Sequence, residues 1–349
     1  MLLSFSGVVW MAREYRLPVL PTTVIGSYPR PKWLRAAIKM YRRGRLGEEE
    51  LREAMDDAVV AVLKDHELAG VDIPSDGEQR RDEMVEYFAE RIGGFKFYGP
   101  VRVWGNAYFR KPAVVAPLRY ERPIVVEEFE YLRRVSYSEV VKVTITGPYT
   151  IADWSFNEYY RSKEELVREL ARIVNAELKA LERAGAVFVQ VDEPALPTHE
   201  DEVEWAVKAV NEAFRGVRLK LGMHICYGAY ERILPYIDKL DVSQFALEFA
   251  NRGFKDLELL KEYGFDKELG FGVVDVHNRR VESPEEVASA IRKALKILPP
   301  EKLYINPDCG LKLLPRRIAR EKLRSMVEGA RIVRKELKKE GYEEIKISI

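Results

Sequence analysis

The chain has 349 residues, of which 57 are Lys or Arg and 56 are Asp or Glu, so its formal net charge is +1. This balance argues against the basic surface of a nucleic-acid-binding protein and against attraction to an anionic membrane, so neither partner is expected. Two cysteines cannot build a disulfide framework, which indicates a reduced compartment and predicts a cytoplasmic protein.

Residues 1–16 are expected to form a flexible N-terminal extension. Their apolar start, MLLSFSGVVWM, is shorter than the roughly 20 residues that a membrane span needs. Arg13 and Arg16 follow this stretch, whereas a secretory signal begins with its basic residues. Met11 is therefore a candidate initiator, and residues 17–349 are expected to form one domain.

From residue 17 onward, short β-branched runs alternate with longer stretches that have apolar residues at helical spacing. The candidate strands cover residues 22–26, 71–75, 140–146, 186–192, 217–225, 241–248, 271–276 and 302–308. Helical spacing is clearest over residues 48–70 and 162–185, and the second stretch ends in Gly, a frequent helix C-cap residue.

Alternating strands and helices predict parallel strands joined by right-handed crossovers. Eight strands in one such series are typical of the (β/α)8 barrel, so the expected fold class is α/β, a single TIM barrel. An open doubly wound sheet is the competing architecture, but the Gly-rich nucleotide fingerprint that often follows its first strand is missing. Residues 95–132 interrupt the alternation and are expected to be a β-rich insertion between the second and third strands.

Polar residues follow the predicted strands at the ends where barrel enzymes place their chemistry. From the fourth strand to the eighth they are Asp192 and Glu193, His224 and Cys226, Glu248, Asp275 and His277, and Asp308 and Cys309. Both cysteines and two of the four histidines therefore fall at one rim, which indicates a functional site there.

The spacing of His224 and Cys226 predicts a metal site. Residues two apart on a strand point to the same side, so both side chains are expected to face the barrel interior. A thiolate and an imidazole together suit Zn²⁺, and Cys309 and Glu248 can complete four ligands. The alternative is that both cysteines are buried as small apolar residues, as free cysteines often are.

The charge of such a site limits the reactions that it can catalyse. Two thiolates and one carboxylate around Zn²⁺ leave about one negative charge, which makes the ion a poor acidifier of water. It can still hold a substrate thiol as the nucleophilic thiolate. The sequence therefore favours attack by a bound thiol on an electrophilic carbon over hydrolysis.

Several blocks of the sequence, taken together, are more specific than any single motif. In chain order they are LPTTVIGSYPR, SDGEQRRDEMVEYFAE, ITGPYTIADWSF, VQVDEPALP, HICY, ALEFANR, GVVDVHN and NPDCGLK. From about residue 17 to about residue 335 the chain resembles the catalytic, C-terminal half of cobalamin-independent methionine synthases. The spacing from Cys226 to Glu248 to Cys309 is also similar to the zinc site of that family.

The resemblance implies a zinc-dependent methyltransferase that converts L-homocysteine to L-methionine. It implies one zinc ion per chain, held by His224, Cys226, Glu248 and Cys309. It also implies that five residues bind the amino-acid end of homocysteine, with the two carboxylates near its ammonium: Ile25, Gly26, Ser27, Glu78 and Asp192.

The resemblance further implies how the methyl donor is handled. His277 would be the proton donor, assisted by Asp192, and Trp154 would lie beside the pterin ring of a methyl-tetrahydropterin. The chain differs from the family's two-barrel members in lacking their N-terminal barrel and in having Tyr108 and Phe109 where they have an Arg-Cys pair. These differences argue against a folate as the methyl donor, and the alternative donor is methylcobalamin or a corrinoid protein.

Two other functions remain open at this point. The same zinc-thiolate chemistry could act on another small thiol such as coenzyme M, although the five predicted amino-acid-binding residues favour homocysteine. A zinc-stabilised, non-catalytic subunit of a corrinoid complex would belong to a different class, and in it no substrate thiol would reach the metal.

Overall fold

The structure is a computed structural model that describes residues 14–104, 107–226 and 230–348. The chain begins with β1 (Glu14–Pro18), which pairs antiparallel with β11 (Glu344–Ser348) near the other end of the sequence. Most of the predicted flexible extension, residues 1–13, lies outside the described residues. Its last three residues, 14–16, belong to β1 and pair with β11.

Six parallel strands form the main sheet, in the order β10-β9-β8-β7-β6-β4. They are β4 (Lys142–Thr146), β6 (Phe188–Asp192), β7 (Lys220–Ile225), β8 (Gln244–Leu247), β9 (Glu268–Gly272) and β10 (Leu303–Asn306). Five of the six fall inside their predicted ranges. The prediction for β9, residues 271–276, was wrong at its start, because Glu268 belongs to the strand, where it forms an ion pair with Lys220 of β7.

The first two predicted strands, residues 22–26 and 71–75, are reduced to isolated bridges. Thr22 pairs in parallel with Ile305 of β10, and Thr23 pairs in parallel with Ile73. The Lys142 N–H of β4 donates a hydrogen bond of 2.8 Å to the Pro74 carbonyl. The two segments are thus connected to each other and to both edge strands of the main sheet.

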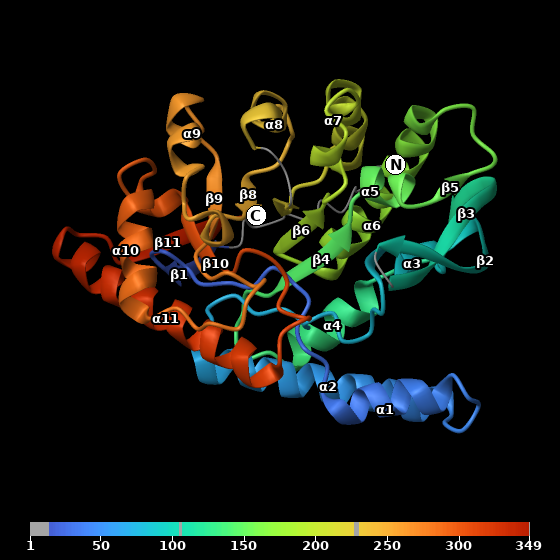
Figure 1. The fold of residues 1–349 in the computed structure, drawn as a ribbon, viewed down its shortest axis with the longest axis horizontal. Helices are drawn as coiled ribbons and strands as arrows, with labels where there is room; N and C mark the ends of the chain where they lie inside the picture. The colour runs from blue at the N-terminus through green and yellow to red at the C-terminus, as the bar shows by residue number, and fades with distance from the viewer. Residues whose placement is uncertain (1–13, 105–106, 227–229, 349) are drawn as a thin grey trace, which may run out of the picture.

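Helices follow the strands as the sequence predicts (Figure 1). The two clearest predictions are confirmed by α2 (Glu48–Ala69) and α6 (Lys163–Ala184), which both end at a glycine in the left-handed conformation, with φ of 83° at Gly70 and 88° at Gly185. The other long helices are α1 (Lys32–Tyr41), α7 (Val203–Asn211), α8 (Tyr230–Ile237), α10 (Pro284–Ala294) and α11 (Arg316–Lys339). None of the described helices is both long enough and apolar enough to span a bilayer.

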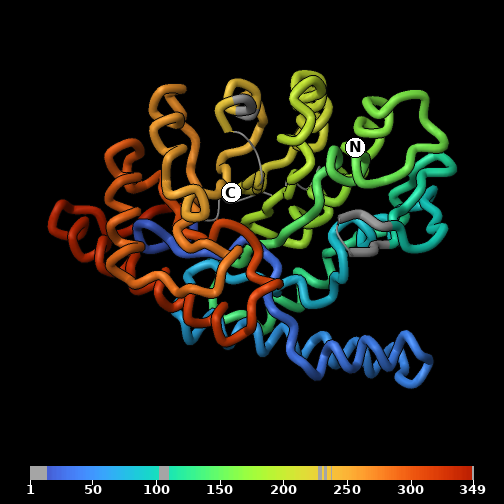
Figure 2. Tube along the Cα trace, in the orientation of Figure 1, coloured from blue at the N-terminus to red at the C-terminus, as the bar shows by residue number. Residues whose placement is uncertain are grey.

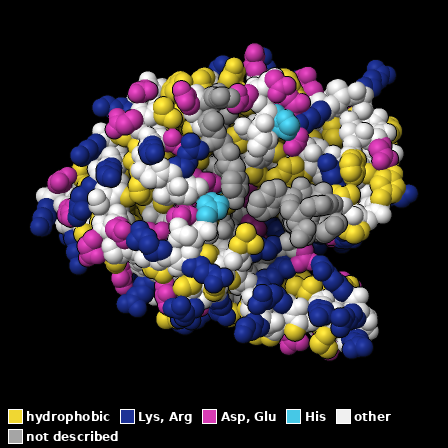
Figure 3. Space-filling model, in the orientation of Figure 1, with side chains coloured by type: hydrophobic (Ala, Val, Ile, Leu, Met, Phe, Trp, Pro, Cys, Tyr) yellow, Lys and Arg dark blue, Asp and Glu magenta, His cyan; other side chains and the backbone are white. Residues whose placement is uncertain are grey.

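Helix α1 and the start of α2 extend away from the rest of the chain (Figure 2). They have a small apolar cluster of their own, which includes Leu34, Ile38 and Leu51. The segment 32–45 has basic residues and no acidic one, and Figure 3 shows Lys and Arg side chains gathered on this projecting part.

A separate hairpin lies between α3 (Met84–Ala89) and α4 (Val126–Val135). Its strands, β2 (Ile92–Trp104) and β3 (Ala107–Tyr120), pair antiparallel, and β3 also pairs with the short β5 (Phe156–Asn157). Extra strands were predicted over 95–132, and the last part of that range is instead helical. Phe129 and Leu132 of α4, three residues apart, are both buried, which is the spacing of a helix face.

The two faces of the main sheet differ in polarity, and this difference positions the site. One face has apolar side chains from every strand, such as Val143, Val189 and Phe245, all buried. Residues two apart on a strand share a face. The alternate positions of these strands therefore form the opposite face, and many of them hold buried polar groups. They are Lys142, Thr144, Thr146, Gln190, Asp192, Lys220, His224, Gln244 and Asn306.

His66 of α2 is fully buried, and the sequence predicts no functional role for it. Neither ring nitrogen has a hydrogen-bond partner within the described part of the chain, and the ring packs edge-on to Tyr28 with centroids 5.1 Å apart. Burial lowers the pKa of His66 to about 3. The folded protein therefore keeps this ring neutral at pH values where the unfolded chain protonates it.

Replacing His66 with Phe is expected to make the protein less sensitive to acid. The neutral ring contributes its full stability above the unfolded pKa of about 6.5 and loses it as the pH falls below that value. Between pH 7.5 and 5.0 the wild type should lose about 2 kcal/mol more unfolding free energy than the variant, from 1.36 kcal/mol per pH unit below about 6.5. Urea unfolding at the two pH values measures the difference, and equal losses in both proteins would contradict the prediction.

Candidate functional site

The register of the main sheet brings three candidate segments to one edge. Asp192, the last residue of β6, pairs with His224 of β7, and His224 pairs with Ala246 of β8. Cys226 and Glu248 each follow directly after a strand end. These strands are parallel, so all of their carboxyl ends lie on the same side of the sheet.

Two cysteines and one histidine, far apart in the sequence, form a compact cluster at this edge. One ligand atom each from His224, Cys226 and Cys309 lies within 4.8 Å of the other two. His224 and Cys226 are buried, and Cys309 is partly exposed. These three side chains are close enough together to bind one metal ion.

The histidine is oriented as a metal ligand would be. Its Nδ1 lies 2.9 Å from the Ala246 carbonyl oxygen and donates to it, so Nε2 is the ring nitrogen that could bind a metal after losing its proton. Nε2 is buried and has no hydrogen-bond partner among the oxygen and nitrogen atoms of the described residues. A buried imidazole nitrogen in a cluster with two cysteines fits a thiophilic divalent cation such as Zn²⁺.

Without a metal, the two thiols and the imidazole have strongly different pKa values. A hydrogen bond from Cys226 lowers the pKa of Cys309 well below its ordinary value, against burial, and the positive charge of His224 adds to this effect. The same hydrogen bond and burial raise the pKa of Cys226. Burial opposes protonation of His224, but the negative charge of Cys309 raises its pKa to about 9. Cys309 is therefore the thiolate of the pair.

Glu248 lies beside the cluster but is not part of it. It is buried, and its Oε2 accepts a hydrogen bond of 2.6 Å from the Asn251 side chain. Burial raises its pKa, and the charge of Cys309 raises it further. Its carboxylate oxygens do not come within 4.8 Å of all three ligand atoms of the cluster.

Asp308 fixes the loop that follows Glu248. Its carboxylate accepts hydrogen bonds from three successive backbone N–H groups, those of Phe249, Ala250 and Asn251, at 2.9, 2.9 and 2.7 Å. Asp308 also precedes Cys309 directly. One fully buried side chain thus connects the loop of Glu248 with the chain segment of Cys309.

The segment Ile25–Gly26–Ser27 lies between Glu78 and the cysteine segment. A Cβ atom added to Gly26 would collide with Glu78 Oε1, and one added to Gly310 would collide with Ser27 Oγ. The backbone N–H of Leu311 donates a 2.8 Å hydrogen bond to the Ser27 carbonyl. Only glycines at positions 26 and 310 allow these close approaches.

Two carboxylates face this segment. Glu78 has a left-handed backbone with φ of 53°, and its Oε1 accepts a 2.9 Å hydrogen bond from Thr144. Burial raises the pKa of Glu78 and raises that of Asp192 to about 7, and the charge of Glu78 raises the pKa of Asp192 further. A bound cation would relieve this cost by pairing with them.

Two further predicted residues are exposed on the surface. His277 is exposed, its N–H donates to Asp275 Oδ1 at 2.8 Å, and its charge lowers the pKa of Glu248, which places it near that carboxylate. Trp154 is 39% exposed at the end of α5 (Pro148–Asp153), and no hydrogen bond or ring contact joins it to the other candidates within the described chain. The side chains of Tyr108 and Phe109 lie outside the described residues.

Sequence reasoning missed the polar residues that support the site. Gln190 donates to Asp192 Oδ1 at 2.8 Å, and Lys142 donates to Gln190 Oε1 at 2.9 Å. A signal for Gln190 was present, since it stands two residues before Asp192 and so shares its side of the strand. Asn251 offered no such signal, because it belongs to a loop.

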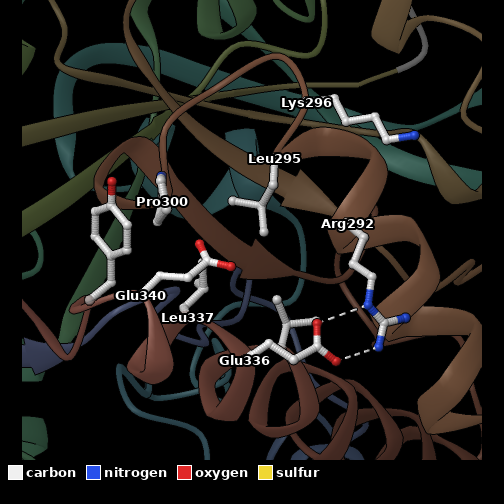
Figure 4. A pocket seen from close by; sticks show the side chains of 9 residues that line it. Arg292, Leu295, Lys296, Pro300, Glu336, Leu337 and Glu340 are labelled. Atoms are coloured by element: carbon white, nitrogen blue, oxygen red, sulfur yellow. Dashed lines mark hydrogen bonds and ion pairs between the residues drawn. The ribbon is translucent and has the colours of Figure 1, made fainter.

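A surface cavity of about 300 Å³ lies between α10 and α11 and is separate from this site (Figure 4). The ion pair between Arg292 and Glu336 crosses its wall, with N–O distances of 2.7 and 3.0 Å. None of the candidate residues lines it.

Comparison with known proteins gives concordant matches. The family described as "Cobalamin-independent synthase, Catalytic domain" matches residues 20–332. A methionine synthase of Saccharolobus solfataricus is 62% identical over 329 residues, which cover 94% of this chain and 98% of that protein. A methionine synthase of Sulfurisphaera tokodaii is 58% identical over 93% of this chain and 96% of its own length.

Solved structures agree with these matches. A B12-independent methionine synthase from Shewanella sp. W3-18-1, in complex with selenomethionine, superposes with a TM-score of 0.82 at 34% identity, covering 91% of this chain and 99% of that one. A methyltransferase from Methanosarcina mazei has a TM-score of 0.64 at 16% identity, over 91% and 94% of the two chains, and shows the fold alone.

Proposed function

Because the chain belongs to the cobalamin-independent methionine synthase family and is a homocysteine methyltransferase, we propose that it depends on one Zn²⁺ ion bound at the strand ends. The observation that supports this most directly is the cluster of His224, Cys226 and Cys309, in which Nδ1 of His224 is engaged by the Ala246 carbonyl and Nε2 has no oxygen or nitrogen partner among the described residues. Two sulfurs and one nitrogen are a donor set that zinc prefers.

Glu248 would be the fourth ligand. It is buried next to the cluster, and the Asn251 side chain and the hydroxyl of Tyr230 hold its carboxylate and backbone. Zinc in this position would lower the pKa of a substrate thiol and keep it as a thiolate. The chain's own part is to present the three ligands in a buried, oriented set.

The amino-acid end of L-homocysteine would bind between Ile25–Ser27 and the two carboxylates. Glu78 and Asp192 both have pKa values raised by burial, so a substrate ammonium would pair with them and stabilise their charged forms. The 34% identical Shewanella protein was solved with selenomethionine, an amino acid of the same shape as the product, which supports an amino-acid site in the family.

In the transfer step, the homocysteine sulfur would form a bond to the methyl carbon while the bond from that carbon to its donor breaks. The thiol proton is lost before the step, and the donor keeps the electron pair of the broken bond. His277, exposed near Glu248, would supply a proton to the leaving group, assisted by Asp192. Trp154 would contact the donor, which we propose is a methyl-corrinoid or a methyl-tetrahydropterin.

The same proposal extends to the architecture. The bridges of Thr22 to Ile305 and of Thr23 to Ile73, with the hydrogen bond from Lys142 to Pro74, would close the six-stranded sheet into an eight-membered barrel. Residues 17–349 would then be one catalytic domain, with the hairpin β2–β3 as its insertion.

The proposal predicts that a substrate sulfur joins the metal. Zinc-loaded protein should show two sulfur neighbours by X-ray absorption, and three after L-homocysteine is added. A donor panel of methylcobalamin, methyl-tetrahydrofolate and methyl-tetrahydromethanopterin, with coenzyme M as the competing thiol, identifies the reaction. If the zinc X-ray absorption spectrum does not change when L-homocysteine is added, the proposal is wrong and the metal is structural.

A further inference from the structure

A completely buried lysine lies inside the sheet, on the same face as the site. Lys142 is the first residue of β4 and has no exposed surface. Its ammonium donates hydrogen bonds to the Val24 carbonyl at 2.8 Å and to Gln190 Oε1 at 2.9 Å, and lies 5.0 Å from the centre of the Phe188 ring. A carbonyl, an amide oxygen and an aromatic face therefore occupy its three donor directions.

This arrangement does not serve stability well. A buried ammonium whose partners are neutral retains much of its desolvation cost, because no carboxylate bonds to it among the described residues. Burial lowers the pKa of Lys142 to about 7, although the more distant charge of Asp192 acts in the opposite direction. An apolar side chain of similar size would avoid the desolvation cost of the charge, but it would leave the Val24 carbonyl and Gln190 Oε1 without their donor.

The ammonium does, however, determine which way the Gln190 amide points. Because Gln190 Oε1 accepts from Lys142, its Nε2 faces the other side, where it donates to the Ile25 carbonyl at 2.9 Å and to Asp192 Oδ1 at 2.8 Å. A reversed amide would place an oxygen against these two acceptors. In its protonated form the lysine has only donors, so the ammonium permits one amide orientation.

We propose that Lys142 is a positioning residue for the amino-acid end of the substrate. It holds Val24 directly and Ile25 and Asp192 through Gln190, so that the Ile25–Ser27 segment and the Asp192 carboxylate keep one relative position. This inference rests on the proposed function, since it takes these groups as the site of the homocysteine ammonium and its neighbouring atoms.

The test is the variant Lys142→Met, with Lys220→Met as its matched control. Lys220 is the first residue of β7, is buried on the same face, and pairs with Glu268 instead of with any site residue. In Lys142→Met the KM for L-homocysteine and the Kd for L-methionine should rise about tenfold, which corresponds to about 1.4 kcal/mol. The kcat at saturating substrate and the zinc content should stay at the wild-type values.

Lys220→Met should leave both constants unchanged, whatever its effect on melting temperature. The double variant Lys142→Met/Gln190→Met should bind no more weakly than the weaker single variant, because the two residues act as a unit.

Unchanged KM and Kd in Lys142→Met, with a wild type that binds both ligands, would overturn this inference alone. A weakening of equal size in Lys220→Met would also overturn it, since the effect would then follow from any buried lysine. A wild type that binds neither homocysteine nor methionine would overturn the proposed function, and this inference with it.

Discussion

Replacing Cys309 with Ser is expected to remove both the bound zinc and the methyl transfer activity. Cys309 is the thiolate of the cluster, held in that form by Cys226 and His224, and a serine hydroxyl does not ionise near neutral pH to replace it. Changes to residues that only support a metal ligand cost roughly 10–100-fold in affinity, so loss of the ligand itself should exceed about 100-fold. Metal content after dialysis against a chelator, and product formation from homocysteine, measure the two effects.

A histidine pair provides the control for this experiment. His224→Gln should lose zinc as Cys309→Ser does, because it removes the free Nε2 from the cluster. His199→Gln should retain zinc and activity, since His199 is only partly buried and its Nε2 contacts Asp153 Oδ1 at 3.1 Å rather than the cluster. Full zinc content in Cys309→Ser would show that the sulfur cluster does not bind the ion.

The sequence predicted those parts of the fold that have a strong local pattern. The helices over 48–70 and 162–185 combine a long amphipathic repeat with a terminal glycine, and both are confirmed within one residue at each end. The first two strands are the contrary case, because segments 22–26 and 71–75 make only single bridges to their neighbours. Their β-branched residues indicate an extended chain, but regular pairing depends on partners far away in the sequence.

The family was predicted correctly from the order of its motifs, and the cluster of both cysteines with His224 agrees with the strand-end argument. The roles of the individual site residues stay predictions. What sequence reasoning could not supply is the supporting layer, because its contacts join residues such as Lys142 and Val24, 118 positions apart. Only the folded register determines which of many polar residues meet.

Loss of the Asp308 carboxylate is expected to disturb the metal site without touching a ligand. In Asp308→Ala three backbone N–H groups of residues 249–251 lose their acceptor, and a buried, unsatisfied donor such as that of Phe249 costs about 1–3 kcal/mol. We expect the unfolding free energy to fall by about 3–5 kcal/mol, the range for breaking a buried polar network. The loop after Glu248 should become free to move, so zinc affinity should fall roughly 10–100-fold, as for other supporting residues.

A second buried aspartate separates this effect from general destabilisation. Asp65 of α2 is also buried and accepts from Arg316 at 2.6 Å and from Tyr28 at 3.3 Å, and no hydrogen bond or ion pair within the described chain joins it to the cysteine cluster or Glu248. Asp65→Ala should therefore lower the melting temperature and leave the zinc affinity at its wild-type value, measured below the melting temperatures of both variants. If both variants lose zinc in proportion to their lost stability, Asp308 supports the fold in general. If only Asp308→Ala loses zinc, its three hydrogen bonds hold Glu248 and Cys309 in place for the metal.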